Sequence, residues 1–475
     1  MLKQPQDRHQ GLMFNSIEDL VSSESYVRIL DKFVDLFLSK ESKYLKGQSH
    51  TGRPAYPSSI MFKILLYGYL NRITTSRRLE AETYRNIELM WLIGGLKPDH
   101  KTISDFKTLN SDLIQDFSKQ LKQFLISSKF IDGQLIAIDG TKLKANASRS
   151  NMIYYEDIIA KLKKLDVELA VYLTEMDSLD AIDKANEELI KSKSELEDRV
   201  AKQQSEIDVL KSQITTMEQI NRKSLSLTDP DCRIIKSSEG KIPAYNVQIT
   251  SDSQNHFIVN EDVTNFETDM SLLESPLQNI KSELGLEVIK LCADAGYYDA
   301  DQIQRIEERS GVECFVNVQG NGMVENGITF KYIKEQNHYV CSQGQVLVQS
   351  GKYHPKRRTM AVSFIGKKCK SCPIMEKCTT SKKAKVLTRY WNQDFRDNYR
   401  FKMQKEESLK ILKKRKSIIE HINGTIKVWA GKIPIHLRGI EKVTNEVKLY
   451  CTAYNVRRLL NLCSFDKIMR LLEAY

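Results

Sequence analysis

The chain has 475 residues, of which 41% are hydrophobic and 28% are charged. This balance is typical of a globular protein with two or more structural units, and it excludes the disordered and collagen-like classes. No stretch approaches the roughly 18 to 20 unbroken apolar residues of a membrane span, and no apolar signal core follows the amino terminus. We therefore expect a cytoplasmic protein with no membrane partner.

The charge of the chain is large and uneven. Lys and Arg total 72 against 61 Asp and Glu, a net charge of +11, which favours a polyanionic partner. Residues 156–220 hold 16 acidic and 9 basic residues, so this segment carries −7 and the rest of the chain carries +18. The remainder is therefore much more basic than the average suggests.

The first part of the chain is expected to be helical. Apolar residues recur at helical spacing through residues 16–128, and short polar breaks such as TGRPAYPSS and LKPDHKTISDFK separate the periodic segments. Several short helices that carry Arg and Lys fit a helix-turn-helix-like module, so we expect a helical DNA-binding domain over residues 1–130. An ordinary helical domain with a basic surface would give the same pattern.

The acidic segment is expected to be a coiled-coil insertion over residues 156–225. It lies within a run from Thr141 to Asp229 that contains no Gly and no Pro, and its apolar residues alternate at three and four spacing. Asp183 and Asn186 occupy apolar slots at mid-length, which indicates two helices that fold back as a hairpin. A solvated arm or a dimer contact is the simplest role for it.

Strand patterns flank this insertion. Apolar runs at residues 134–139, 245–250, 256–263, 287–294 and 312–318 are typical of strands, with helices before and after the fourth. An initial meander followed by alternating helix and strand indicates a mixed sheet of the α/β class. We expect residues 131–155 and 226–320 to form this core.

Acidic residues stand at two of the expected strand ends. Asp139 closes the first strand and Asp294 closes the fourth, so both can reach one edge of the sheet and share a divalent cation. Taken singly, an Asp at a strand end is more often a helix cap or a turn former. A third carboxylate, Glu420, lies in a helix expected over residues 398–429, with Lys416 and Lys427 on the same face; its rivals, which spacing does not exclude, are Glu406, Glu407 and Glu441.

Three motifs in order resemble the DDE transposases of bacterial insertion sequences. They are IDGTKLKANASR (138–149), ADAGYYDADQI (293–303) and RKSIIEHINGTIK (415–427), behind a basic helical head that contains GRPAYPSSIMFKILLYGYL. The likeness spans nearly the whole chain. It implies a ribonuclease H-like core, a helical amino-terminal DNA-binding domain, and a nucleoid-associated protein acting as a homodimer on double-stranded DNA, both element ends and target.

The resemblance also implies roles for individual residues. Asp139, Asp294 and Glu420 match the family's triad, which holds two Mg²⁺ ions, or Mn²⁺ in their place. Lys427 matches the family's Lys after the Glu, and Arg415 or Lys416 matches its Arg before the Glu; both are implied contacts with DNA. Carboxylates suit such hard cations, and two cations can stabilise the attacking and leaving oxygens of a phosphodiester exchange.

One position departs from the family pattern. A Tyr is expected about three residues before the Arg, and this chain has Leu412 there. Loss of a phosphate-contacting phenol should weaken DNA-end binding more than metal binding. A non-catalytic DNA-binding protein derived from a transposase is therefore one alternative, and a nuclease without strand transfer is another.

Residues 321–395 are expected to form a β-rich insertion with a structural zinc site. Cys369, Cys372 and Cys378 lie in CKSCPIMEKC, and Cys341 lies upstream. Two residues separate Cys369 from Cys372, as in zinc knuckles, and four thiols complete a tetrahedral Zn²⁺ site. Plain reduced cysteines are the alternative reading.

The same insertion begins a strongly basic stretch. Residues 352–416 hold 21 Lys and Arg and 5 Asp and Glu, a net charge of +16. Aromatic residues are interleaved with the basic ones, which is typical of nucleic-acid contacts. We expect Lys356, Arg357 and Arg358 to contact phosphates, and residues 396–475 to hold the catalytic helix and the carboxy-terminal helices.

Overall fold

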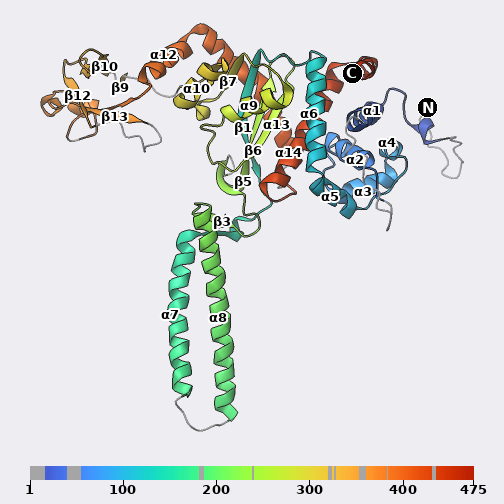
Figure 1. Cartoon of the computed structure of the whole chain (residues 1–475), viewed down its shortest axis with the longest axis horizontal. Coiled ribbons are helices and arrows are strands. Elements are labelled where there is room, and N and C mark those ends of the chain that lie inside the picture. Colours follow the sequence, from blue (N-terminus) through green and yellow to red (C-terminus); the bar gives the residue numbers. More distant parts are fainter. Residues whose placement is uncertain are drawn as a thin grey trace, which may run out of the picture.

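The computed structural model describes residues 16–39, 55–180, 187–237, 240–318, 324–325, 328–351, 360–381, 383–430 and 435–475. A central sheet with its helices lies between a helical amino-terminal region and a small β-rich region, and a long helical hairpin projects from the centre (Figure 1). This arrangement confirms the predicted α/β class with a helical amino-terminal region.

Among the described residues, six α-helices form the amino-terminal region. Their bounds are α1 Tyr26–Ser39, α2 Ser58–Leu70, α3 Ser76–Arg85, α4 Ile87–Leu92, α5 His100–Leu109 and α6 Ser111–Ser127. Every residue of α2 from Met61 to Leu70 is buried, because α1 and the later helix α14 (Ile440–Leu462) pack on it. Side-chain caps start two of these helices: Asn86 accepts from the amide of Leu89, and Asp99 from that of Thr102.

The central sheet is mixed. Its strands are β1 Leu135–Lys144, β4 Arg233–Ser237, β5 Gly240–Asp252, β6 Ile258–Thr264, β7 Lys290–Ala293 and β8 Glu313–Val316. The order is β4-β5-β1-β7-β8, and β6 also pairs with β5. Strand β5 runs antiparallel to β1, β4 and β6, whereas β1, β7 and β8 are mutually parallel. Helices α9 (Glu274–Asn279) and α10 (Ala300–Ser310) lie in the connections to β7 and β8.

The first strand is longer than the sequence predicts. We expected it to end at Asp139, but β1 continues to Lys144. Gly140 and Thr141 stay in the ladder because β5 pairs with them, through Gln248 and Val247. Asp139 therefore lies within a strand.

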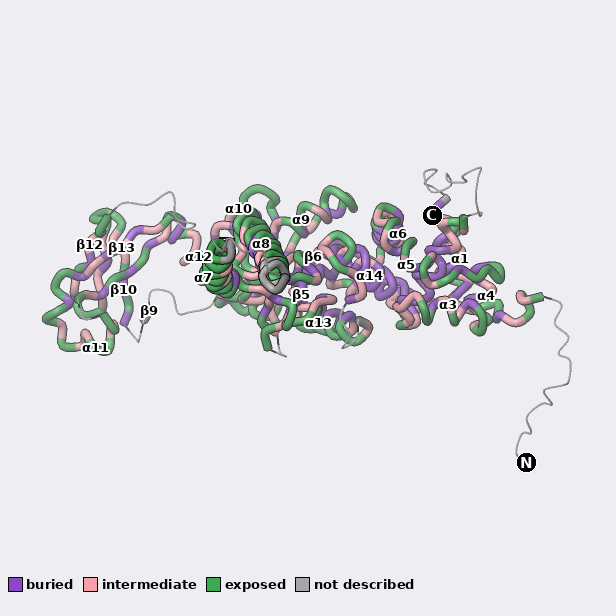
Figure 2. Tube along the Cα trace, turned by 90° about the horizontal axis from the view of Figure 1, so that it is seen from below, coloured by how far each residue is buried: buried purple, intermediate pink, exposed green. Residues whose placement is uncertain are grey.

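The hairpin consists of α7 (Tyr155–Asp180) and α8 (Glu187–Gln219), and the strands β2 (Met152–Tyr154) and β3 (Ser224–Ser226) pair at its base. The helices are about 39 and 50 Å long at 1.5 Å per residue. They pack side by side over a small apolar cluster that includes Ile158, Leu162 and Ile207. Most of their remaining surface is exposed (Figure 2). Asp183 and Asn186 lie outside the described residues.

The β-rich region is an antiparallel sheet of order β14-β13-β12-β11-β10-β9. Its elements are β9 Val324–Glu325, β10 Ile328–Ile333, β11 His338–Cys341, β12 Val346–Ser350, β13 Ala361–Ile365, α11 Met375–Cys378 and β14 Val386–Tyr390. Its buried core is small: Ile328, Phe330, Tyr339, Leu347, Val362, Phe364 and Leu387.

After β14, the rest of the chain returns to the central sheet. It forms α12 (Gln393–Gln404), α13 (Glu406–Ala430), α14 and α15 (Phe465–Ala474). The predicted single helix over 398–429 is therefore wrong, because Lys405 adopts an extended conformation (ψ 147°) and separates α12 from α13. The Ser408 hydroxyl donates to the carbonyl of Lys402 across this break. No helix in the described ranges is long and apolar enough to cross a membrane.

Candidate active site

Two parallel strands bring Asp139 and Asp294 to adjacent positions. Strands β1 and β7 pair with Ala137 opposite Cys292, so the same register carried two residues further sets Asp139 opposite Asp294. Neighbouring strands lie about 4.8 Å apart. Strand β7 ends at Ala293, and Asp294 caps the next turn by accepting from the amide of Gly296 at 2.8 Å.

Asp139 is mostly buried, and its carboxyl group has a shifted pKa. Its side chain is 20% exposed, and burial raises the pKa of its carboxyl above the ordinary value. The positive charge of Arg415 lowers this pKa, and the negative charge of Asp294 raises it further. Hydrogen bonds from Asn423 and Gly140 also lower it. The negative charge of Asp294 beside the Asp139 carboxyl makes this a suitable place for a cation.

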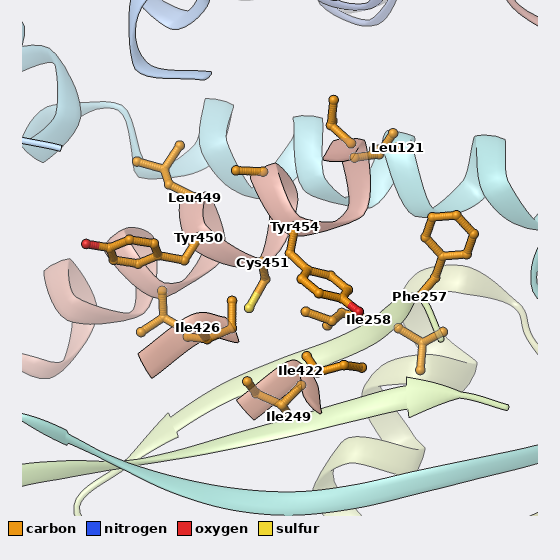
Figure 3. Close-up of a cluster of buried hydrophobic side chains, with 14 of the residues drawn as sticks. Leu121, Ile249, Phe257, Ile258, Ile422, Ile426, Leu449, Tyr450, Cys451 and Tyr454 are labelled. Carbon is orange, nitrogen blue, oxygen red and sulfur yellow. The ribbon is translucent and has the colours of Figure 1, made fainter. Parts of the chain in front are cut away.

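Helix α13 supplies the third acidic residue. One apolar face of this helix, formed by Ile418, Ile419, Ile422 and Ile426, is fully buried. Figure 3 shows Ile422 and Ile426 between α14, with Cys451 and Tyr454, and the strand that carries Ile249. This packing holds α13 against β1. Glu420 lies away from this buried face, and its side chain is 50% exposed.

Arg415 connects Glu420 to Asp139. Its Nη2 lies 3.3 Å from Glu420 Oε1, and its Nη1 lies 3.7 Å from Asp139 Oδ2. The Arg415 side chain is only 12% exposed, whereas the neighbouring Lys416 is exposed. Of the two basic residues that the sequence left as alternatives, Arg415 is the one directed at the carboxylates.

Asn423 is a site residue that the sequence reasoning missed. Its Nδ2 donates to Asp139 Oδ2 at 2.9 Å, and its side chain is almost completely buried. Its Oδ1 has no hydrogen-bond partner. The only available signal was its position three residues after Glu420, which places the two on adjacent turns of one helix.

A polar network lies behind the carboxylates. Asp269 accepts from Lys142 and from Gln248, and Gln248 in turn accepts from the hydroxyl of Tyr297 in the turn after Asp294. A Cβ atom at Gly140 would lie 2.6 Å from Asp269 Oδ1, so only glycine leaves room for this network beside Asp139.

The donor set is suited to hard divalent cations. Carboxylate and amide oxygens are the ligands that Mg²⁺ prefers. Within the part of the chain that the structure describes, no three His, Cys, Asp or Glu side chains stand together at metal-ligand spacing, neither at these carboxylates nor at the cysteines. At the carboxylates, Arg415 lies between Asp139 and Glu420. The unpartnered Asn423 oxygen and the two adjacent aspartates fit a cation at Asp139.

The other predicted DNA contacts lie in different environments. Lys427 is exposed on α13, as is Lys416. Lys356, Arg357 and Arg358 fall outside the described residues. Part of the basic stretch is used internally, because Arg389, Arg396 and Lys402 pair with Asp394, Asp301 and Glu307 at 2.7 to 3.1 Å. Leu412, at the departure from the family pattern, packs against the core.

The four predicted zinc ligands gather in the β-rich region. Cys341, Cys369, Cys372 and Cys378 line one pocket together with Phe330 and Leu347. Burial raises the pKa of the Cys378 thiol; Lys385 opposes this, and the other three cysteines add to it. The other three sulfurs therefore lie close enough to Cys378 to affect the ionisation of its thiol.

Comparison with known proteins gives two sequence matches. A family described as Transposase domain (DUF772) matches residues 15–109, and a family described as Transposase DDE domain matches residues 340–460. No curated protein matches the chain. A cryo-EM structure of a piggyBac transposase synaptic complex with hairpin DNA has 10% sequence identity and a TM-score of 0.34, covering 94% of this chain and 79% of the other. That TM-score is too low to equate the two folds.

Proposed function

This chain is a DNA transposase of the DDE type, and we propose that it binds the ends of a bacterial insertion sequence and catalyses their hydrolysis and strand transfer with Mg²⁺. Asp139, Asp294 and Glu420 would hold the cations. The observation that carries this proposal is the parallel register of β1 and β7, which sets Asp139 of β1 beside Asp294 just after the end of β7, with the helix that bears Glu420 packed against both strands.

The chain's own residues would prepare the site. Bound divalent cations would stabilise the attacking and leaving oxygens of the phosphodiester. Asp139, held by the Asn423 amide and flanked by Arg415, keeps its carboxylate fixed beside the end of β7. Arg415 Nη1 is buried without a hydrogen bond, so it has a donor left for a phosphate oxygen.

The test is Mg²⁺-dependent cleavage of a duplex that carries the element's terminal sequence. Asp139→Asn, Asp294→Asn and Glu420→Gln should each lose cleavage by a factor of about 10³ or more while keeping end binding, because several kcal/mol of transition-state stabilisation are removed. Glu441→Gln, at the rival glutamate that is exposed at the start of α14, should keep wild-type cleavage.

Each other outcome has a specific meaning. Cleavage that survives Glu420→Gln would assign the third ligand to another glutamate. End binding without any cleavage by the wild type would favour the alternative of a non-catalytic DNA-binding protein.

We also propose a division of labour along the chain. Residues 1–130 would bind the element ends, residues 131–155 and 226–320 would form the catalytic core, and residues 396–475 would supply the catalytic helix. The coiled-coil insertion would span residues 156–225 and the β-rich insertion residues 321–395. Two ends must be joined, so the chain would act as a homodimer on DNA at the bacterial nucleoid, which light scattering of the end complex would test.

A structural zinc ion in the β-rich region is a second proposal. Its support is the shared pocket of the four cysteines and the small apolar core beside it, because small units commonly need a metal for stability. Metal analysis of the purified protein should give one zinc per chain. Cys372→Ser should lower this content, whereas Cys463→Ser, outside the pocket, should leave it unchanged; protein without zinc would contradict the proposal.

A further inference from the structure

The side-chain amide of Asn423 has a hydrogen-bond partner for its nitrogen but none for its oxygen. The side chain is 7% exposed, and its Nδ2 donates to Asp139 Oδ2 at 2.9 Å. Its Oδ1 is buried with no hydrogen-bond partner. Leaving a buried acceptor unpaired costs about 1 to 3 kcal/mol, so such an atom calls for an explanation.

The surroundings indicate which partner the oxygen lacks. Asp139 beside it is an acceptor and offers no donor when ionised. On the same helix, Arg415 Nη1 is also buried without a hydrogen bond, 3.7 Å from Asp139 Oδ2. An unpaired acceptor and an unpaired donor therefore adjoin one carboxylate. A cation bound to Asp139 would serve the acceptor, and a phosphate oxygen would serve the donor.

We propose that Asn423 is an additional ligand of the divalent cation at Asp139, binding it through Oδ1 while Nδ2 holds the carboxylate in place. The inference rests on the proposed function, because the cation site at Asp139 is itself proposed there. It adds an amide oxygen to the three carboxylates, and neutral amide oxygens are ordinary ligands of hard cations.

The test measures Mn²⁺ binding to the full chain by electron paramagnetic resonance of the free ion, with no cleavage step. Asn423→Ala should weaken Mn²⁺ binding about tenfold or more. Asn423→Asp should bind at least as tightly as wild type, because it keeps an oxygen ligand. If Asn423 only held Asp139, the Asp variant would bind as weakly as the Ala variant, since a carboxylate cannot donate to a carboxylate.

Asn455→Ala is the matched control. Asn455 is also buried, but both ends of its amide are bonded at 2.9 Å, to the amide and the carbonyl of Ile258. The Asn455→Ala variant should lose thermal stability and keep its Mn²⁺ affinity. This result would separate the loss of a metal-coordinating side chain from general destabilisation.

The outcomes distinguish this inference from the proposed function. Wild-type affinity in Asn423→Ala, or weak binding in Asn423→Asp, would overturn the role of Asn423 alone. Unchanged affinity in Asp139→Asn, or no Mn²⁺ binding by the wild type, would overturn the cation site and this inference with it.

Discussion

The central sheet with the helices packed on it, called the core below, and the α7–α8 hairpin both carry many charged residues, yet they use them differently. In the core, Glu261 is 1% exposed and lies between Lys122 and Lys448, and Arg415 is 12% exposed beside Asp139. In the hairpin, Lys161 and Glu206 form a 2.6 Å pair whose side chains are 55% and 43% exposed. Buried charges must be matched by specific partners, whereas water and salt screen the exposed ones.

The difference follows from packing. Helix α13 is covered by the sheet on one side and by α14 on another, so its polar residues are directed at defined neighbours. The hairpin has only two helices, and Val167 and Val171 remain exposed on it. Charged residues at helical spacing therefore meet defined partners on α13, whereas on the α7–α8 hairpin they face solvent.

The largest expected effect on stability comes from the buried charge cluster. Burial opposes ionisation of Glu261, but Lys122 and Lys448 outweigh it and lower its pKa. Glu261→Gln should reduce the free energy of unfolding at pH 7 by about 3 to 5 kcal/mol, because two buried lysines lose their counter-charge. Denaturant unfolding of both proteins measures this.

The pH dependence of this loss has a definite sign. A carboxyl with a lowered pKa stabilises the fold above its unfolded pKa, about 4.3 for Glu, and loses that contribution as the pH falls through its folded pKa. The stability gap between wild type and Glu261→Gln should therefore narrow in acid. If the difference in unfolding free energy between the two proteins stays constant as the pH falls, Glu261 is not ionised in the folded protein.

Removing apolar packing under the site should have the next largest effect. Ile422→Ala leaves a cavity between α13, α14 and β5, and should cost about 3 kcal/mol in the free energy of unfolding. Val171→Ala on the exposed face of α7 should lower the free energy of unfolding by about 0.5 kcal/mol at most. Equal losses in the two variants would show that α13 is not anchored by this face.

Arg415 should affect the pH dependence of metal binding. It lowers the pKa of Asp139, so Arg415→Gln should raise that pKa further. Cations need the ionised carboxylate, so Mn²⁺ binding by the variant should disappear at a higher pH than in wild type as the solution is acidified. Lys416→Gln, an exposed neighbour, should follow the wild-type profile; identical shifts would indicate a general charge effect.

The smallest effect is expected in the hairpin. Glu206→Gln removes the partner of Lys161 and should change the free energy of unfolding by about 0 to 0.5 kcal/mol, because exposed ion pairs are screened. A loss above about 2 kcal/mol would mean that the charged residues of the hairpin stabilise the fold as strongly as the buried ones of the core.

The sheet and its two aspartates were predictable because apolar runs that end in an acid carry local information. The true end of β1 was not, since Gly140 reads as a turn residue and only pairing with β5 keeps it extended. The break at Lys405 has no Gly or Pro to mark it. At the break, the Ser408 hydroxyl donates to the carbonyl of Lys402, a local contact that the residue types alone do not reveal.

The site was predictable only in part for a similar reason. Helical spacing placed Lys416, Glu420 and Lys427 on one face, but packing decides that Arg415 and Asn423 are the residues directed at Asp139. Which turn of α13 contacts β1 is a long-range property. An asparagine inside a helix gives no pattern from which a ligand could be inferred. The triad and the domain boundaries stay predictions until they are tested.

The most direct test of the account is to locate the cation. Crystals of the protein soaked in Mn²⁺ should show an anomalous difference peak bonded to the carboxylates of Asp139 and Asp294, with Glu420 turned toward them and away from Arg415. A peak at that place, absent in Asp139→Asn, is the predicted result. Mn²⁺ bound elsewhere, with Asp139 still paired to Arg415, would contradict the central claim.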